Sequence, residues 1–253
     1  MSKNEITSVK NALRILQCFQ LDAPIKGVTD IAEETGISKS TVHRLLQTLQ
    51  QEGFVKQRKN YAKYELGMTI LKLHTIYSQN STLYNATLDT LLTLSEQTNG
   101  VAHIAVFEHE AIVYLNKVAK QQVIELKSHI GHTNFVHCTA TGRVLLAHQC
   151  DDVVQRVLRQ PLKRFTPRTL IEPSRLYEEL AHVRKQGYAV VEGEYNVTMT
   201  SMAVPIVNPT GHVIAAVNIV IPSKQLDDLK KQRYITLLQH EAMRVKKRLA
   251  AYR

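Results

Sequence analysis

A cluster of hydroxyl-bearing and basic residues between positions 38 and 44 has the composition of a surface that contacts DNA. Hydroxyl groups and a helix N-terminus suit the phosphates of the DNA backbone. A guanidinium group can make two hydrogen bonds to guanine in the major groove, and Arg44 is the candidate for that contact. Basic residues recur at positions 56–59. The candidate DNA-contacting residues are Ser38, Lys39, Ser40, Thr41, His43, Arg44, Arg58 and Lys59.

The spacing of apolar residues predicts the elements that would position this cluster. Helices are expected over 8–20, 29–35 and from Ser38 to the helix-stopping Gly53, with Thr29 and Ser38 as N-caps. The short turn at 36–38 between the last two helices is typical of a helix-turn-helix, whose recognition helix enters the major groove by its N-terminal end. A β-hairpin over 54–66 follows, and its basic tip would lie along the DNA as a wing.

The rest of the chain predicts an α+β domain. A helix over 68–77 is interpreted as a linker, and the polar residues 79–82 mark a boundary. The expected domains are 1–67 (DNA-binding), 68–80 (linker helix) and 81–253 (sensor). Within the sensor, helices are expected over 83–98, 139–149, 152–158, 174–186 and 226–252, and strands over 101–107, 111–118, 123–127, 188–192, 202–207 and 213–219.

Composition limits the classes of protein to which the chain can belong. Its 253 residues, 44% of them hydrophobic, are enough for a buried core in one or two domains. The net charge of +10 is compatible with a polyanionic partner. Three widely spaced cysteines fit a reducing compartment, and no signal peptide or membrane-spanning run is apparent. We therefore expect a cytoplasmic protein that makes no contact with a membrane.

Several segments together resemble the IclR family of bacterial transcription regulators. The N-terminal segments are ITSVKNALRILQCF, DIAEETGISKSTVHRLLQTLQQEGFV and YELG. The C-terminal ones are HCTATGRVLLAH, VRKQGYAVVEGEY, MAVPI and VIAAVNIVIP. The resemblance covers nearly the whole chain, and it implies a winged helix-turn-helix, a linker helix and a profilin-like or GAF-like effector-binding domain.

The resemblance also implies partners. Members of the family form homodimers chiefly through the N-terminal region, and often pairs of dimers, and they bind pseudo-palindromic operators on double-stranded DNA. They control catabolic genes in response to a small organic or aromatic acid, and repression is favoured here over activation. No cofactor or metal is expected.

The family's effector pocket lies between the sheet and the loops around the TATG segment. By motif, the backbone N–H groups of Ala140 and Thr141 would hold a carboxylate, which is a sensible anion site at a helix N-terminus. The expected effector-binding residues are Val123, Leu126, Asn134, Ala140, Thr141, Ser201, Asn218 and Val220.

Departures from the family pattern predict an altered pocket. Val220 and Asn218 stand where the family often has two polar residues, typically serines, and Val191 replaces a usual acidic residue. Residues 198–200, Thr-Met-Thr, replace a common Gly-Val-Arg. A larger or less hydrophilic ligand than glyoxylate or pyruvate is the hypothesis.

Two alternatives stay open at this point. An enzyme could use Cys138 as a nucleophile with His137 as its base, or a metal held by these two with His129 and His132. That hypothesis leaves the first 66 residues unexplained. An architectural DNA-binding protein without a ligand would leave a sensor-sized domain without a purpose.

Overall fold

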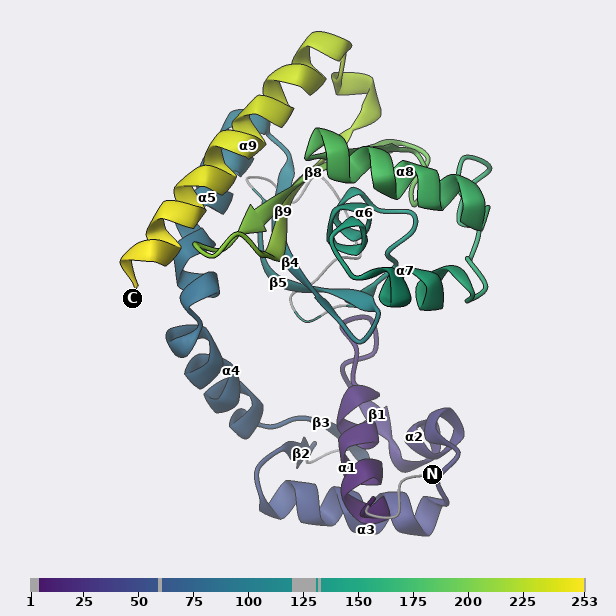
Figure 1. The fold of residues 1–253 in the computed structure, drawn as a ribbon. Coiled ribbons are helices and arrows are strands. Elements are labelled where there is room, and N and C mark those ends of the chain that lie inside the picture. Colours follow the sequence, from purple (N-terminus) through teal and green to yellow (C-terminus); the bar gives the residue numbers. More distant parts are fainter. Residues whose placement is uncertain (1–4, 59–60, 120–130, 132, 253) are drawn as a thin grey trace. The chain divides into compact units, whose positions relative to one another are not determined.

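The computed structural model describes residues 5–58, 61–119, 131 and 133–252 (Figure 1). The chain forms two compact units, Met1–Asn80 and Ser81–Arg253. The expected strand over 123–127 lies outside the described residues.

The N-terminal unit is built on three helices, α1 (Thr7–Gln17), α2 (Val28–Thr35) and α3 (Lys39–Gln51). One side of each helix is buried, so the helical spacing of apolar residues in the sequence corresponds to a shared core. This core contains Ile15, Cys18, Ile31, Ala32, Val42, Leu46, Leu49, Val55 and Tyr64.

The two predicted N-caps have different outcomes. Ser38 does cap α3, because its Oγ accepts the N–H of Thr41 at 3.3 Å. Thr29 does not cap α2: the helix begins one residue earlier, with Gly27 as its N-cap. The Asp30 carboxylate accepts the Gly27 N–H at 2.8 Å. This hydrogen bond fixes the start of the helix at Gly27, and Thr29 therefore lies inside the helix.

A three-stranded sheet completes the winged fold. Its strands are β1 (Lys26–Gly27), β2 (Val55–Gln57) and β3 (Lys63–Leu66), in the order β1-β3-β2. The hairpin β2–β3 was predicted. Strand β1 was not predicted, because two residues are too few to show the alternation of apolar and polar side chains that indicates a strand. The next helix, α4 (Met68–Asn80), has no buried residue among those described, and it extends three residues beyond its predicted end.

The C-terminal unit contains a six-stranded antiparallel sheet, which confirms the α+β class. Its order is β6-β5-β4-β9-β8-β7. The two-residue strand β6 was not predicted. The strands are β4 (Val101–Glu108), β5 (Ala111–Ala119), β6 (Thr133–Asn134), β7 (Ala189–Glu192), β8 (Met199–Val207) and β9 (Val213–Pro222).

Helices cover both faces of this sheet (Figure 1). On one face α5 (Thr82–Thr98) and α9 (Asp228–Ala251) pack on Ile104, Val204 and Val217. On the other face α6 (Ala140–Ala147), α7 (Asp151–Leu158) and α8 (Pro173–Gln186) form a second core. Because side chains alternate along a strand, Ala105, Ala203 and Ala216 face α6, whereas their neighbours Ile104, Val204 and Val217 face α5 and α9.

Small side chains lie beneath α6. Ala105, Ala203 and Ala216 are fully buried on three adjacent strands, in the same core as α6. At Gly142 an added Cβ would lie 2.4 Å from the backbone of Val136, so the helix and the preceding segment touch backbone to backbone. This close packing fixes where the N-terminal turn of α6 lies.

Candidate DNA-contacting surface and effector site

The N-terminal half of α3 exposes the residues that the sequence singled out. Ser38, Lys39, Ser40, His43 and Arg44 are exposed, whereas Val42 and Leu46 point into the core. Thr41 is half-buried, and it receives a 2.9 Å hydrogen bond from Ser38. The Ser38 hydroxyl is therefore already used within the helix cap. Lys39, Ser40, His43 and Arg44 remain available to a partner on one exposed surface.

The wing carries a compact ion-pair cluster. Glu65 on β3 lies directly opposite Lys56 on β2, and their side chains approach to 2.8 Å. Arg58 donates through Nε to the second oxygen of the same carboxylate at 3.0 Å. These hydrogen bonds, with that from Lys56 first, hold the pKa of Glu65 below its usual range. The predicted contact Lys59 lies outside the described residues.

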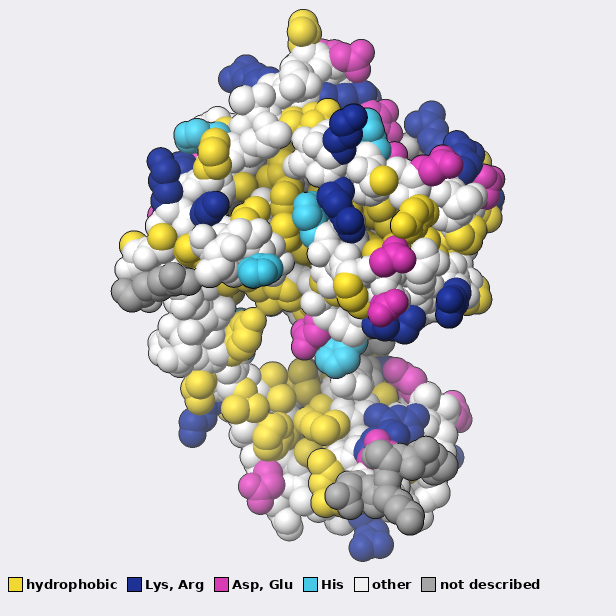
Figure 2. Space-filling view, viewed as in Figure 1, with side chains coloured by type: hydrophobic (Ala, Val, Ile, Leu, Met, Phe, Trp, Pro, Cys, Tyr) yellow, Lys and Arg dark blue, Asp and Glu magenta, His cyan; other side chains and the backbone are white. Residues whose placement is uncertain are grey.

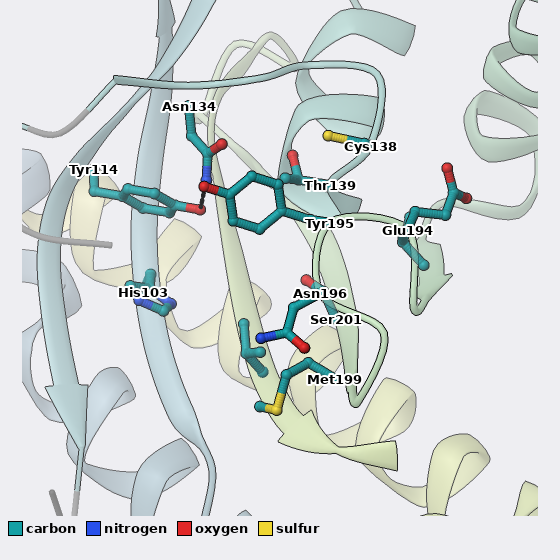
Figure 3. Close-up of a pocket in the computed structure, with 12 residues that line it drawn as sticks. His103, Tyr114, Asn134, Cys138, Thr139, Glu194, Tyr195, Asn196, Met199 and Ser201 are labelled. Atoms are coloured by element: carbon teal, nitrogen blue, oxygen red, sulfur yellow. Dashed lines mark hydrogen bonds between the residues drawn. The ribbon is translucent and has the colours of Figure 1, made fainter. Parts of the chain in front are cut away.

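A cavity opens in the C-terminal unit on the α6 face of the sheet (Figure 3). Its empty space is about 540 Å³, a figure that includes the solvent at its open mouth. Residues from β4, β5, β6, β7, β8 and β9 contribute to its wall, together with the segment before α6 and the loop between β7 and β8. Distant parts of the sequence thus converge on one hollow.

Three of the eight expected effector residues line this cavity, namely Asn134, Ser201 and Val220. Ala140 and Thr141 are fully buried in the first turn of α6, next to Cys138 and Thr139, which do line it. Asn218 is buried beside the cavity and donates to Ser201 Oγ at 3.4 Å. Val123 and Leu126 lie outside the described residues.

The N-terminal turn of α6 borders the cavity with an ordinary cap. Thr139 Oγ1 accepts the N–H of Gly142 at 3.1 Å. The hydroxyl of Thr141 is buried and has no hydrogen-bond partner among the residues that the structure describes. Helix N-termini attract anions through their unsatisfied N–H groups. A carboxylate placed here would meet N–H groups at the start of α6.

Nine further lining residues were not among the expected effector contacts, although Val191 and Met199 had been singled out as departures that alter the pocket. A signal for two of them was present, since His103 and Tyr114 interrupt otherwise apolar strands on the face that packs inward. The loop residues gave no comparable signal because their position depends on the tertiary fold. The nine residues are His103, Tyr114, Cys138, Thr139, Val191, Glu194, Tyr195, Asn196 and Met199.

Three ionisable groups of the cavity wall are uncharged near neutral pH, namely His103 and Tyr114 on the sheet and Tyr195 on the β7–β8 loop. Burial lowers the pKa of His103 to about 3, with the charge of Lys117 acting in the same direction. Burial raises the pKa of Tyr114 to about 12 and also raises that of Tyr195. Desolvation disfavours the charged form in each case. A ligand therefore meets neutral hydrogen-bonding groups from these three residues.

One buried ion pair holds the loop that closes the cavity. Arg143 on α6 is 3% exposed, and its Nη2 lies 2.6 Å from both carboxylate oxygens of Glu194. Arg143 Nε also donates to the carbonyl of His137 at 2.9 Å, and Leu170 N–H donates to Glu194 at 2.9 Å. The pair joins α6, the segment before it and the β7–β8 loop.

The geometry at Cys138 does not suit a nucleophile. Burial raises the pKa of its thiol to about 12, so the reactive thiolate is scarce at neutral pH. His137 Nε2 lies 2.9 Å from the carbonyl oxygen of Lys163, and no hydrogen bond joins His137 to Cys138 in the described part of the chain. The described residues contain no cluster of three potential metal ligands, and His129 and His132 fall outside them.

No described helix is long and apolar enough to cross a membrane.

Comparison with known proteins assigns both halves of the chain. Residues 8–59 match the model of the IclR helix-turn-helix domain, and residues 75–247 match that of the bacterial transcriptional regulator IclR C-terminal domain. The chain is 31% identical over 243 residues to the HTH-type transcriptional regulator KdgR of Escherichia coli, covering 96% of this chain and 92% of that protein. It is 27% identical to the transcriptional repressor IclR of the same organism, covering 88% and 83% respectively.

A solved structure with the same fold contains a ligand. It is an IclR homologue from Microbacterium hydrocarbonoxydans in complex with 4-hydroxybenzoate. The TM-score is 0.87 at 25% identity, and the match covers 96% of this chain and 99% of that one.

Proposed function

Because the chain belongs to the IclR family of bacterial transcriptional regulators, and so is a DNA-binding regulator rather than an enzyme, we propose that it is a repressor of a catabolic operon that a small organic or aromatic acid controls. Residues 1–67 would bind DNA, 68–80 would form the linker, and 81–253 would bind the acid. Its place of action would be the cytoplasm, where the operator DNA is. The observation that carries the proposal is the cavity beside the N-terminal turn of α6.

The exposed residues of α3 support the proposed DNA contacts. Arg44 and His43 would reach base edges, and Lys39 with Ser40 would bind phosphates near the helix N-terminus. Ser38 and Thr41 would shape the first turn, and the Thr41 hydroxyl would donate to a phosphate of the DNA backbone. Arg58 and Lys59 of the wing would add phosphate contacts outside the helix.

A homodimer would cover an apolar surface on the N-terminal unit, where hydrophobic side chains gather in Figure 2. Ile6, the N-cap of α1, is 66% exposed, and Val9 and Leu13 on the same side of the helix are 53% and 55% exposed. Exposed apolar residues also recur on α4, including Met68 and Leu71. A two-fold dimer that buries such a stripe fits a pseudo-palindromic operator. Dimers of dimers would be a further step.

The small-acid effector is supported by the chemistry of the cavity. The N-terminal turn of α6 can hold a carboxylate, and the rings of Tyr114 and Tyr195 can contact an organic body. The homologue with bound 4-hydroxybenzoate shares the fold over nearly the whole chain. An architectural role without a ligand gives no reason for this cavity, and we therefore favour the ligand-controlled regulator.

The experiment is fluorescence anisotropy on DNA from upstream of the protein's own gene. A scrambled duplex of equal length is the control, at two salt concentrations, with and without a pool of small carboxylic acids. The ligand-controlled repressor would be supported if the protein binds the native duplex more tightly than the scrambled one and if the acids weaken that binding. Equal binding to both duplexes, with strong salt dependence, would contradict sequence-specific regulation at that site.

A further inference from the structure

Five neighbouring strands each place one uncharged polar side chain on the α6 face of the sheet. We call them the polar row: Asn134 on β6, Tyr114 on β5, His103 on β4, Asn218 on β9 and Ser201 on β8. Four of these residues line the cavity, and Asn218 lies between two of them. The row follows the strand order without a gap.

Contacts connect the row from end to end. The amide of Asn134 approaches the Tyr114 hydroxyl at 3.4 Å, and the Tyr114 and His103 rings lie 4.8 Å apart between centroids. His103 and Asn218 are cross-strand partners. The Asn218 amide then reaches the Ser201 hydroxyl at 3.4 Å.

The row lies on a sheet face whose neighbouring part, beneath α6, carries apolar core. Beneath α6, the same face carries Ala105, Ala203 and Ala216. His103 and Asn218 are each 1% exposed, and burying such groups away from water costs free energy that apolar residues would not cost. The change from alanine to polar side chains occurs where the cavity begins. A ligand that hydrogen-bonds to the row accounts for it.

The orientation of one donor can be assigned. The backbone N–H of Phe135 donates to Asn134 Oδ1 at 2.7 Å, which fixes the amide so that its NH₂ group faces Tyr114. The Tyr114 oxygen therefore accepts the hydrogen bond from Asn134. The hydroxyl proton of Tyr114 is then free to be donated to a different acceptor, such as a ligand oxygen. Figure 3 shows this hydroxyl beside Asn134 on the opposite side of the cavity from Cys138.

We infer that the polar row recognises hydroxyl groups of the effector, and that the effector is a hydroxylated carboxylic acid rather than its unhydroxylated analogue. The inference rests on the proposed function, since the carboxylate would occupy the N-terminal turn of α6. A site that hydrogen-bonds a substrate hydroxyl discriminates strongly against the analogue that lacks it, because its own polar groups are left unpaired.

The test measures binding of matched acids to the full-length protein by calorimetry. One pair is 4-hydroxybenzoate and benzoate; the other is gluconate and hexanoate. In at least one pair we expect the hydroxylated acid to bind about tenfold or more tightly than its partner. Equal affinities within both pairs would overturn the inference and leave the effector proposal standing. No binding of any of the four acids would count against the effector proposal and the inference together.

Tyr114→Phe keeps the ring and removes the hydroxyl. It should reduce the preference within the responsive pair to about threefold or less, with little change for the unhydroxylated acid. Tyr234→Phe, on α9 and the other face of the sheet, is the matched control and should retain the full preference. An unchanged preference in Tyr114→Phe would overturn the inference. If Tyr114→Phe does not fold, Ser201→Ala at the other end of the row replaces it, with the same expected direction and the same overturning result.

Discussion

The exposed surface of α3 and the cavity in the C-terminal unit place polar groups by different means. On α3, Ser40 and Arg44 come from one helical turn and stand in solvent, so their positions follow from local sequence. In the cavity, Asn134 and Ser201 are separated by 67 positions in the chain and meet only because the sheet brings their strands together. Local periodicity thus determines the first surface, and tertiary packing determines the second.

This contrast predicts different responses to substitution. A change on α3 should affect DNA binding with little effect on folding. A change among the buried groups of the cavity should affect stability and ligand binding together.

The strongest test of the cavity is Arg143→Leu. This substitution removes the guanidinium group and leaves the buried Glu194 carboxylate without its ionic partner. Breaking such a buried pair costs about 3–5 kcal/mol of unfolding free energy. Urea unfolding of the C-terminal unit would measure the loss. The control is Arg175→Ala, whose exposed partner Glu172 lies at 3.7 Å and whose removal should cost less than about 1 kcal/mol. Equal losses in the two variants would show that the loop has another anchor.

The corresponding test of α3 is Arg44→Ala. We expect specific DNA binding to weaken by about 1–3 kcal/mol, with relaxed specificity at the contacted base pair and unchanged urea unfolding. Anisotropy on native and scrambled duplexes measures both effects. Arg233→Ala removes the same charge from an exposed position on α9 and should leave specificity intact. If Arg44→Ala retains wild-type affinity, another residue reads the base.

The same contrast explains how much could be predicted from the sequence. The helices of the N-terminal unit, the Ser38 cap and the hairpin follow from local patterns and are confirmed. The two-residue strands β1 and β6 were missed because pairing with a distant strand, and not local propensity, creates them. The Thr29 cap was wrong because the pattern could not show that Asp30 binds the Gly27 N–H.

For the cavity, the family resemblance located the region but not the residues that form most of the wall. Val220 and Ser201 were expected from strand motifs, and both line the cavity. The pair Arg143–Glu194 was not expected, because its partners lie 51 positions apart and neither motif alone implies the other. Tyr195 was missed for the same reason: only the fold places the β7–β8 loop beside the sheet.

A pH titration tests whether a buried polar group of the cavity costs stability. The folded pKa of His103 is about 3, below its ordinary value of 6.5, so the unfolded chain binds the additional proton. The contribution of neutral His103 to the free energy of unfolding is fully present above pH 6.5 and is lost as the pH falls towards 3. Between pH 7.5 and 5.5 this loss should be about 1 kcal/mol of unfolding free energy. His103→Gln should remove that part of the pH dependence, and His182→Gln, on α8, should not. A slope unchanged by His103→Gln would show that His103 is not buried in its neutral form.

The smallest expected effect is at the wing, where an exposed ion-pair cluster resembles the α3 surface rather than the cavity. Glu65 binds both Lys56 and Arg58 and thereby competes with DNA phosphates for two cations. Glu65→Gln should strengthen binding to native and scrambled duplexes alike by about two- to fivefold, with a steeper salt dependence. Glu96→Gln, which makes the same charge change at an exposed position of α5, separates the local effect from the change in net charge. Because phosphate contacts carry no sequence information, the ratio of the two affinities should stay constant. A change in that ratio would mean that Glu65 also orients a residue that reads bases. If Glu65→Gln and Glu96→Gln strengthen DNA binding equally, Glu65 acts only through the net charge of the protein.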